Sequence, residues 1–188
     1  MKPKPTSYCE YVKQFPPNHV HRIHHDSLHG YAVTNDDALF ERLILEINQA
    51  GLSWATILNK LDNFRKAYDG FSISRVASYD EKDRKRLLED AGIIRNRLKV
   101  DAAIHNANVI LKLQREFGSF RNWLNHHHPM SREEWTRLFR KTFQFTGSEI
   151  VNEFMMSTGY LPGAHTPDCP LYKDVLASGP MWAKKDLH

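Results

Sequence analysis

The sequence has few cysteines and no long apolar run, and both shortages exclude whole classes of protein. Cys9 and Cys169, the two cysteines, stand at opposite ends of a chain of 188 residues. A framework of disulfides is therefore excluded, although one end-to-end disulfide remains an alternative to two free thiols. No apolar run reaches 18 residues, and the opening MKPKPTSYCEY has no apolar segment of the kind found in secretion signals. We expect a protein of the reducing cytoplasm.

The chain also lacks internal repeats, low-complexity tracts, long linkers and a convincing alternating pattern of β-strands. Hydrophobic residues make up 41% and charged residues 26%, which is ordinary for a soluble globular protein. The net charge of +4 permits an acidic partner without requiring one. We predict one all-α domain over residues 1–188.

Apolar periodicity and capping residues predict a succession of helices after an irregular segment rich in histidine and proline, residues 1–33. The motif SREE at 131–134 is a capping box that begins one of these helices. The other helices are expected at residues 35–48, 54–70, 74–79, 81–90, 97–117 and 148–158.

The stretch LEINQAGLSWATIL, residues 45–58, places an acid among apolar residues. Glu46 lies at helical spacing with Leu39 and Leu43, on a stripe that otherwise faces a core. A core tryptophan and an ion pair of Glu46 with Arg42 are the more common explanation. Alternatively, the AGLS turn brings Glu46 and Trp54 together as a pocket for a flat, hydrogen-bonding ring.

A short turn containing Gly92 joins two predicted helices within residues 87–110. Arg95, Arg97 and Lys99 follow it into the second helix. Backbone N–H groups at such a turn and helix start can bind a phosphate, and the cations add attraction for nucleic acid. Composition alone favours an ordinary helical corner with solvated arginines.

Residues of the kind that bind metals occur near both ends of the chain. His165 and Cys169 stand four apart in HTPDC, and Cys9 lies near the start. Two cysteines and two histidines make a normal tetrahedral zinc site. The spacing alone is weak, because the chain has eleven histidines and lacks a short Cys-x-x-Cys pair. The histidines available beside Cys9 are His21, His24, His25 and His29.

Taken together, these stretches resemble the 3-methyladenine DNA glycosylase I family. The resemblance is carried by residues 39–71, 89–107 and 143–169 and spans nearly the whole chain. It implies an all-α helix-hairpin-helix DNA glycosylase fold with DNA in a cleft. It also implies one structural zinc that joins the termini, held by Cys9, His25, His165 and Cys169.

The resemblance further implies an N-glycosyl hydrolase of base excision repair, acting on alkylated double-stranded DNA in a bacterial-type cytoplasm. Neither a membrane nor a protein partner is implied. Glu46 would be the catalytic residue and would recognise a flipped-out alkylated adenine, and Trp54 would line the base pocket. The implied DNA contacts are Gly51 and Leu52, which fill the gap in the stack, and the hairpin residues Gly92, Arg95, Arg97 and Lys99.

The implied mechanism depends on the leaving group. An N3-alkylated adenine is cationic, so its glycosidic bond is already weak, and the enzyme mainly has to stabilise an oxocarbenium-like transition state. Many helix-hairpin-helix glycosylases carry a catalytic aspartate beyond the hairpin. This chain has none between Asp101 and Asp168, and the 3-methyladenine family lacks it too.

The chain departs from the family at three aromatic positions of the base pocket, which here hold His21, His24 and His29. Imidazole stacks less broadly than phenol or indole, and its protonated form would repel a cationic base. The departures leave an alternative open: a zinc-stabilised DNA-binding relative with weak, lost or altered activity. A helical protein whose pocket serves a protein partner is a third possibility without a distinct sequence feature.

Overall fold

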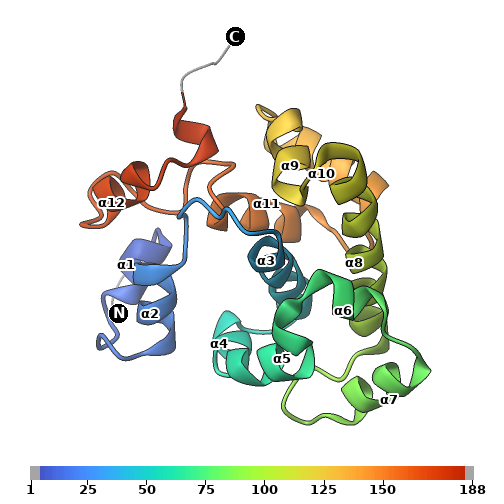
Figure 1. Cartoon of the computed structure of the whole chain (residues 1–188). Helices are drawn as coiled ribbons and strands as arrows, with labels where there is room; N and C mark the ends of the chain where they lie inside the picture. Colours follow the sequence, from blue (N-terminus) through green and yellow to red (C-terminus); the bar gives the residue numbers. More distant parts are fainter. Residues whose placement is uncertain (1–4, 185–188) are drawn as a thin grey trace. The chain divides into compact units, whose positions relative to one another are not determined.

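The computed structural model describes residues 5–184 (Figure 1). These residues form α-helices and two short 3-10 helices without any strand, which confirms the all-α prediction. Within the same residues, no helix is both long and apolar enough to cross a membrane. The contacts divide the chain into a central unit, Thr34–Phe154, and a terminal unit formed by the residues up to Val33 and from Met155 onward. The prediction of a single domain stays a prediction.

The central unit is built around the long helix α8, Arg97–Phe117, which packs against α3, α6, α7 and α9. Large apolar side chains without exposed surface fill its core, among them Phe40, Phe64 and Phe139. The other elements are α3 Asp36–Gln49, α4 Trp54–Leu58, α5 Leu61–Ala67, η1 Asp69–Phe71, α6 Ile73–Ala77, α7 Glu81–Glu89, α9 Phe120–His127, α10 Arg132–Thr142 and the first part of α11 Ser148–Ser157.

One carboxylate fixes the start of α3 against the start of α9. Asp36 accepts hydrogen bonds from the backbone N–H groups of Phe120, at 2.7 Å, and Arg121, at 3.0 Å. It also accepts one from the side chain of Gln114 at 2.7 Å. A helix begins with unpaired N–H groups, so a carboxylate from another helix satisfies them and sets the packing of α3, the helix that carries Glu46.

The helix expected over residues 54–70 is interrupted, so the prediction of one continuous helix was wrong. It divides into α4, α5 and η1, with Lys60 in a non-helical conformation at the break. The ammonium of Lys60 donates to the carbonyls of Ala91, at 2.9 Å, and Gly92, at 3.2 Å. The break thus directs a lysine onto the turn after α7, a contact that apolar periodicity does not reveal.

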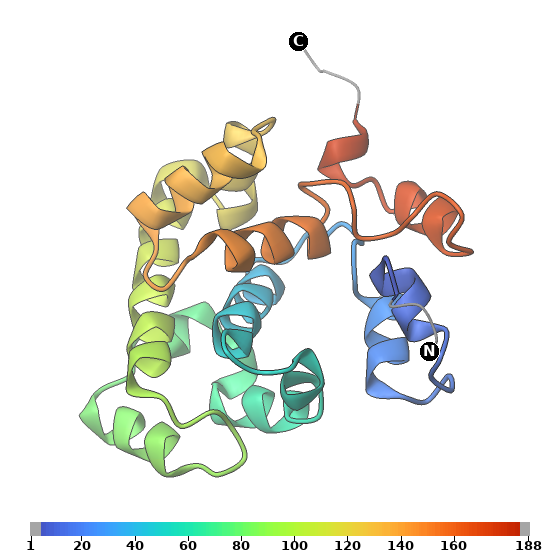
Figure 2. The ribbon, with the colours of Figure 1, turned by 180° about the vertical axis from the view of Figure 1, so that it is seen from behind.

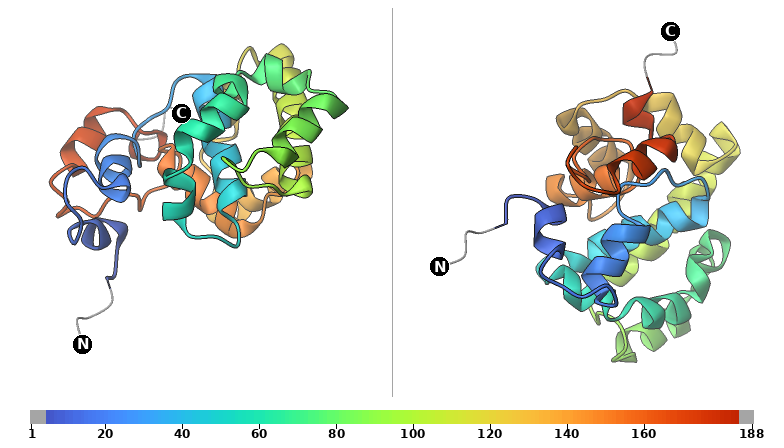
Figure 3. Two further views of the ribbon diagram at one scale, coloured as in Figure 1. Left: turned by 90° about the horizontal axis from the view of Figure 1, so that it is seen from below. Right: turned by 90° about the vertical axis from the view of Figure 1, so that its left-hand side faces the viewer.

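The terminal unit combines segments from both ends of the chain, as the blue and red segments in Figures 2 and 3 show. It contains α1 Tyr8–Val12, α2 Val20–Ser27, the end of α11, α12 Tyr172–Ala177 and η2 Met181–Ala183. The N–H of Gly30 donates to the carbonyl of Ser157 at 2.9 Å and links the two segments.

The prediction that residues 1–33 are irregular was wrong for α1 and α2. Ser7 caps α1 by accepting from the N–H of Glu10, and His19 caps α2 by accepting from the N–H of His21. Both helices are short and separated by prolines, so their periodicity is weak in the sequence. Packing within the terminal unit stabilises them, and tertiary contacts supply most helical stability in proteins.

Candidate functional site

The turn between α3 and α4 carries three of the predicted site residues close together in the chain. Gly51 has φ +79°, a left-handed conformation that glycine adopts without strain. Leu52 is 39% exposed, and its N–H donates to the carbonyl of Gln49 at 2.8 Å. Ser53 then caps α4 by accepting from the N–H of Thr56, so that Trp54, half-buried, is the first residue of that helix.

Glu46 is buried in the last turns of α3, with 7% of its surface exposed. Burial, and then the negative charge of Glu153, raise the pKa of Glu46 to about 8, against the lowering effect of the positive Arg42. The positive charge of Arg42 therefore does not offset the effect of burial on the pKa of Glu46. Near neutral pH the carboxyl group is largely protonated, and a positive charge placed beside it would favour the carboxylate.

Lys99 lies in the first turn of α8 and is 5% exposed. Its ammonium donates to the carbonyl of Asn48 at 2.8 Å and to that of Ala50 at 2.7 Å. These carbonyls belong to the end of α3, where the helix leaves acceptors unpaired. Lys99 thus ties α8 to the turn that carries Gly51 and Leu52, whereas its place in the sequence had grouped it with Arg95 and Arg97, which were predicted to bind phosphate.

The turn between α7 and α8 is closed by side-chain hydrogen bonds. Asp90 accepts from the N–H of Gly92 at 2.7 Å, and Asn96 caps α8 by accepting from the N–H of Lys99 at 3.2 Å. A Cβ atom on Gly92 would meet the Asp90 carboxylate oxygen at 2.9 Å, so a side chain there would require that carboxylate to shift. Arg95 and Arg97 are exposed beside the start of α8.

The four predicted metal ligands come together in the terminal unit and are all buried. Cys9, His25, His165 and Cys169 each offer a ligand atom, and these atoms lie within 4.8 Å of one another. The Cys169 sulfur is 3.3 Å from Nδ1 of His165 and 3.9 Å from Nε2 of His25. The group can hold a metal ion.

The second nitrogen of each histidine in this group already has a partner. Nδ1 of His25 lies 2.6 Å from a carboxylate oxygen of Asp26, and Nε2 of His165 lies 2.8 Å from the carbonyl oxygen of His29. If these nitrogens carry the protons, Nε2 of His25 and Nδ1 of His165 present lone pairs to the shared centre. Such outer partners are typical of histidines that bind metals.

His21, His24 and His29 are buried in the terminal unit around a residue that the sequence analysis missed, Tyr8. The Tyr8 hydroxyl lies 3.0 Å from Nδ1 of His21 and also donates to the carbonyl of that residue at 3.2 Å. Burial, and then the charge of His19, lower the pKa of His21, which favours the neutral imidazole. The position of Tyr8 directly before the predicted ligand Cys9 was the one available signal.

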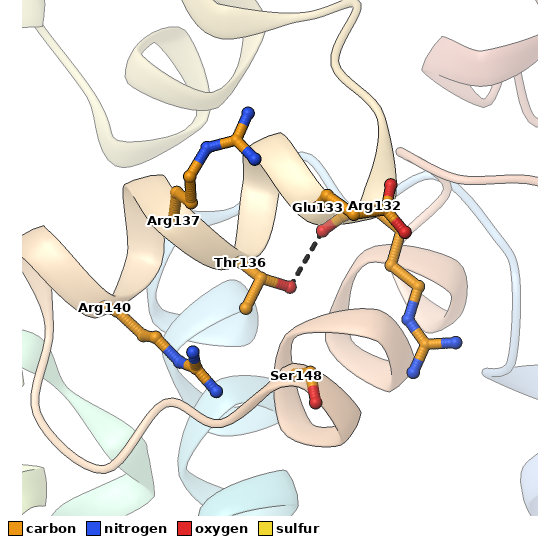
Figure 4. Close-up of a pocket in the computed structure, with 6 residues that line it drawn as sticks. All are labelled: Arg132, Glu133, Thr136, Arg137, Arg140 and Ser148. Atoms are coloured by element: carbon orange, nitrogen blue, oxygen red, sulfur yellow. Dashed lines mark hydrogen bonds between the residues drawn. The ribbon is translucent and has the colours of Figure 1, made fainter.

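The structure also contains a basic pocket that the sequence analysis did not predict (Figure 4). It lies in the central unit between α10 and the start of α11 and has a volume of about 250 Å³. Its lining residues are Arg132, Glu133, Thr136, Arg137, Arg140 and Ser148. One of the three arginines, Arg132, forms an ion pair with Glu149, and the hydroxyl of Thr136 donates to the carbonyl of Arg132. In the sequence these arginines have the spacing of an ordinary solvated helix face.

The fold is that of a known class of helical DNA-repair proteins. A crystal structure of 3-methyladenine DNA glycosylase I matches with a TM-score of 0.75 and 30% identity, covering 86% of this chain and 97% of the other. The Staphylococcus aureus enzyme, solved to explain 3-methyladenine recognition, matches with a TM-score of 0.75 at 27% identity, covering 87% of this chain and 95% of that one.

The sequence specifies the family. The model of the methyladenine glycosylase family matches residues 14–137. DNA-3-methyladenine glycosylase 1 of Escherichia coli is 33% identical over an alignment of 183 positions that covers 87% of this chain and 96% of that protein. The chain belongs to the methyladenine glycosylase family, which confirms the resemblance noted in its sequence.

Proposed function

We propose that this protein is a DNA glycosylase that hydrolyses the N-glycosidic bond of alkylated bases in double-stranded DNA, chiefly 3-methyladenine. The observation that carries the proposal is the buried acid Glu46 in a chain of this family. Water bonds to the sugar carbon and loses a proton to the solvent, and the departing cationic adenine takes the electrons of the broken bond and becomes neutral. Base flipping precedes this step because the bond is not accessible inside the duplex.

In this proposal, Glu46 recognises the flipped base and stabilises positive charge at the reacting centre. A cationic adenine lesion favours the carboxylate form of an acid whose pKa is raised to about 8. The carboxylate then accepts a hydrogen bond from the exocyclic amine and opposes the charge of the oxocarbenium-like transition state. Trp54, at the start of the next helix, supplies an aromatic face for the ring.

The selectivity of Glu46 for adenine is expected to depend on pH. The carboxylate can only accept, so it opposes O6 of a guanine, whereas the protonated acid can also donate to that oxygen. Free 3-methyladenine should bind about 5- to 150-fold more tightly than free 3-methylguanine above the pKa of Glu46, about 8. The ratio should narrow as the pH falls below that value. Calorimetric titration at pH 6 and pH 9 measures it, and a ratio that does not change with pH would contradict this role.

We assign the α7–α8 turn as a helix-hairpin-helix motif that binds the DNA backbone. Exposed Arg95 and Arg97 and the N–H groups at the start of α8 suit phosphate contacts, which position DNA without reading its sequence. Gly51 and Leu52 fill the gap that the flipped base leaves. Lys99 holds the hairpin and the turn of Gly51 and Leu52 together, because its ammonium donates to the carbonyls of Asn48 and Ala50 at the end of α3.

The basic pocket provides a control with the same charge change for the hairpin assignment. The double variant Arg95→Ala/Arg97→Ala should weaken binding to unrelated duplexes about equally. It should also reduce the slope of the logarithm of the binding constant against the logarithm of the salt concentration by about one to two. The double variant Arg137→Ala/Arg140→Ala removes the same charge from the pocket and should have the smaller effect. Fluorescence anisotropy over a salt series compares the two. Equal losses would indicate general electrostatic attraction and leave the hairpin without a special role.

The group of Cys9, His25, His165 and Cys169 is proposed to hold one structural zinc ion. Two thiolates and two imidazoles form a closed tetrahedral complement, without the open position that a catalytic zinc needs. All four ligands are buried in the terminal unit, and they come from segments more than 130 residues apart in sequence. A zinc ion there would hold both chain ends together.

The second candidate function is a DNA-binding relative with weak or altered activity, favoured by the buried imidazoles of His21, His24 and His29. The variant His24→Tyr separates weakened activity from an altered substrate. If the histidine merely weakens stacking, base release from methylated duplex should rise severalfold, as expected for an aromatic contact worth about 1 kcal/mol. Loss of the release of another lesion in this variant would instead assign the histidines to a different substrate.

The decisive experiment measures free bases released by the purified protein from duplex DNA treated with a methylating agent, separated by chromatography. Release of 3-methyladenine is expected. Duplex binding without release of any alkylated base would reject the glycosylase proposal in favour of the binding relative.

A further inference from the structure

We propose that Leu98 and Phe145 join Leu52 in an apolar wedge that contacts the DNA bases where the lesion leaves the stack. This inference rests on the proposed function. It assigns a site to two residues that the sequence analysis and the family resemblance left without a role.

The first observation is where exposed apolar side chains occur. In the described part of the central unit, the large apolar residues that are exposed are Leu52, at 39%, Leu98, at 68%, and Phe145, at 38%. Each of them belongs to a segment that contains Lys99 or is contacted by it. Leu98 precedes Lys99 in the chain, the Lys99 ammonium lies 6.0 Å from the centre of the Phe145 ring, and it donates to Ala50, two residues before Leu52.

The second observation is strain at Phe145. This residue has φ +60°, a left-handed conformation that a bulky side chain rarely adopts. The fully buried Asn106 holds the preceding residue, Gln144, by two hydrogen bonds: its side-chain NH₂ donates to the Gln144 carbonyl at 3.1 Å, and its oxygen accepts from the Gln144 N–H at 2.8 Å. The fold thus keeps a strained backbone that leaves an aromatic ring partly exposed. Strain of this kind is concentrated at functional sites.

The third observation is the charge around the wedge. Arg95 and Arg97 are exposed within three residues of Leu98, and the 21-residue helix α8 begins at Arg97. Positive charge beside an apolar surface matches duplex DNA, whose phosphates lie outside its apolar base faces. Proteins that bend DNA insert apolar side chains between base steps in this way. A protein partner would not need cations placed around the apolar group.

Lys99 gives the wedge its rigidity. Its ammonium joins the end of α3 to α8 and lies beside the loop that carries Phe145. The three apolar side chains therefore come from segments that share one buried cation, although they are far apart in the sequence. A rigid wedge stabilises an unstacked duplex more effectively than three independent side chains, because less freedom is lost on binding.

The experiment compares Leu98→Ala, Phe145→Ala and the double variant with Leu176→Ala, which removes a leucine of the terminal unit that is 39% exposed. Release of 3-methyladenine is measured from a methylated duplex and from the same DNA as a single strand. The wedge acts on stacked bases, so the double variant should lose about tenfold in kcat/KM on duplex and little on the single strand. Leu176→Ala should match the unaltered protein on both substrates.

Equal rates for the double variant and Leu176→Ala on duplex would overturn the proposal, as would equal losses on duplex and single strand. Melting temperatures test folding. If Phe145→Ala does not fold, Leu98→Ala decides alone, because a side chain that is 68% exposed contributes little to packing.

A second measurement separates this inference from the proposed function. Affinity is compared between an intact duplex and one containing a stable abasic analogue. A preference for the abasic duplex that falls in the wedge variants supports the wedge even if no base is released. A preference that these variants retain overturns it.

Discussion

The variant Glu46→Gln is expected to lose about a hundredfold or more in base release while retaining most of its affinity for DNA. An amide keeps the shape of the acid but cannot carry the negative charge that stabilises a cationic base and the oxocarbenium-like transition state. Single-turnover release from methylated duplex measures the first quantity, and anisotropy with an unrelated duplex measures the second. Glu116→Gln, an exposed acid on α8, is the matched control and should change neither. Retained activity in Glu46→Gln would remove this residue from the mechanism.

The same variant should be more stable than the unaltered protein, increasingly so as the pH rises. The pKa of Glu46 is about 8 in the folded chain and near 4.5 in an unfolded one. Between these values the unfolded state releases a proton that the folded state keeps, so the free energy of unfolding falls by roughly 1.4 kcal/mol per pH unit. Glutamine has no proton to release, so the free energy of unfolding of the variant does not fall in this way. Melting temperatures at pH 5 and pH 8 should differ less in the variant, and identical pH profiles would contradict the raised pKa.

Loss of the metal group is expected to produce the largest change in stability. Elemental analysis should find about one zinc per chain in the purified protein and much less in the variant Cys169→Ser. Structural zinc contributes on the order of 10–16 kcal/mol to the folding of small peptides. A loss of even about 3 kcal/mol here would lower the melting temperature by roughly 6–12 °C.

A chelator provides the control for this prediction. It should lower the melting temperature of the unaltered protein towards that of Cys169→Ser and leave the variant unchanged. A protein without zinc, or a variant as stable as its parent, would show that the four ligands form a site without a structural metal.

These two sites were predictable from the sequence to different degrees. Glu46 stood out because a charged residue interrupts an apolar helical stripe, which is a local signal. The metal group did not, because Cys9 and Cys169 are separated by almost the whole chain and eleven histidines offered many combinations. The family resemblance selected the four residues, and the fold then brought their ligand atoms within 4.8 Å of one another.

The starts and ends of α3, α7 and α8 depended on local chemistry and could be predicted from the sequence alone. Asn35, Asp80 and Asn96 each cap the helix that follows them, and Gly118 ends α8 in a left-handed conformation. Each of these interactions joins residues only a few positions apart, so the sequence contains all the information needed. The boundaries of α3, α7 and α8 were accordingly predicted within about two residues.

The hydrogen bonds of the Lys99 side chain depended on tertiary structure. In the sequence it resembled Arg95 and Arg97, but its ammonium binds carbonyls 51 and 49 residues away, at the end of another helix. The pKa of Glu46 likewise depends on burial and on the charge of Glu153, more than 100 residues along the chain. Desolvation and long-range contacts arise only when the helices pack, because in the separate segments water surrounds the same groups.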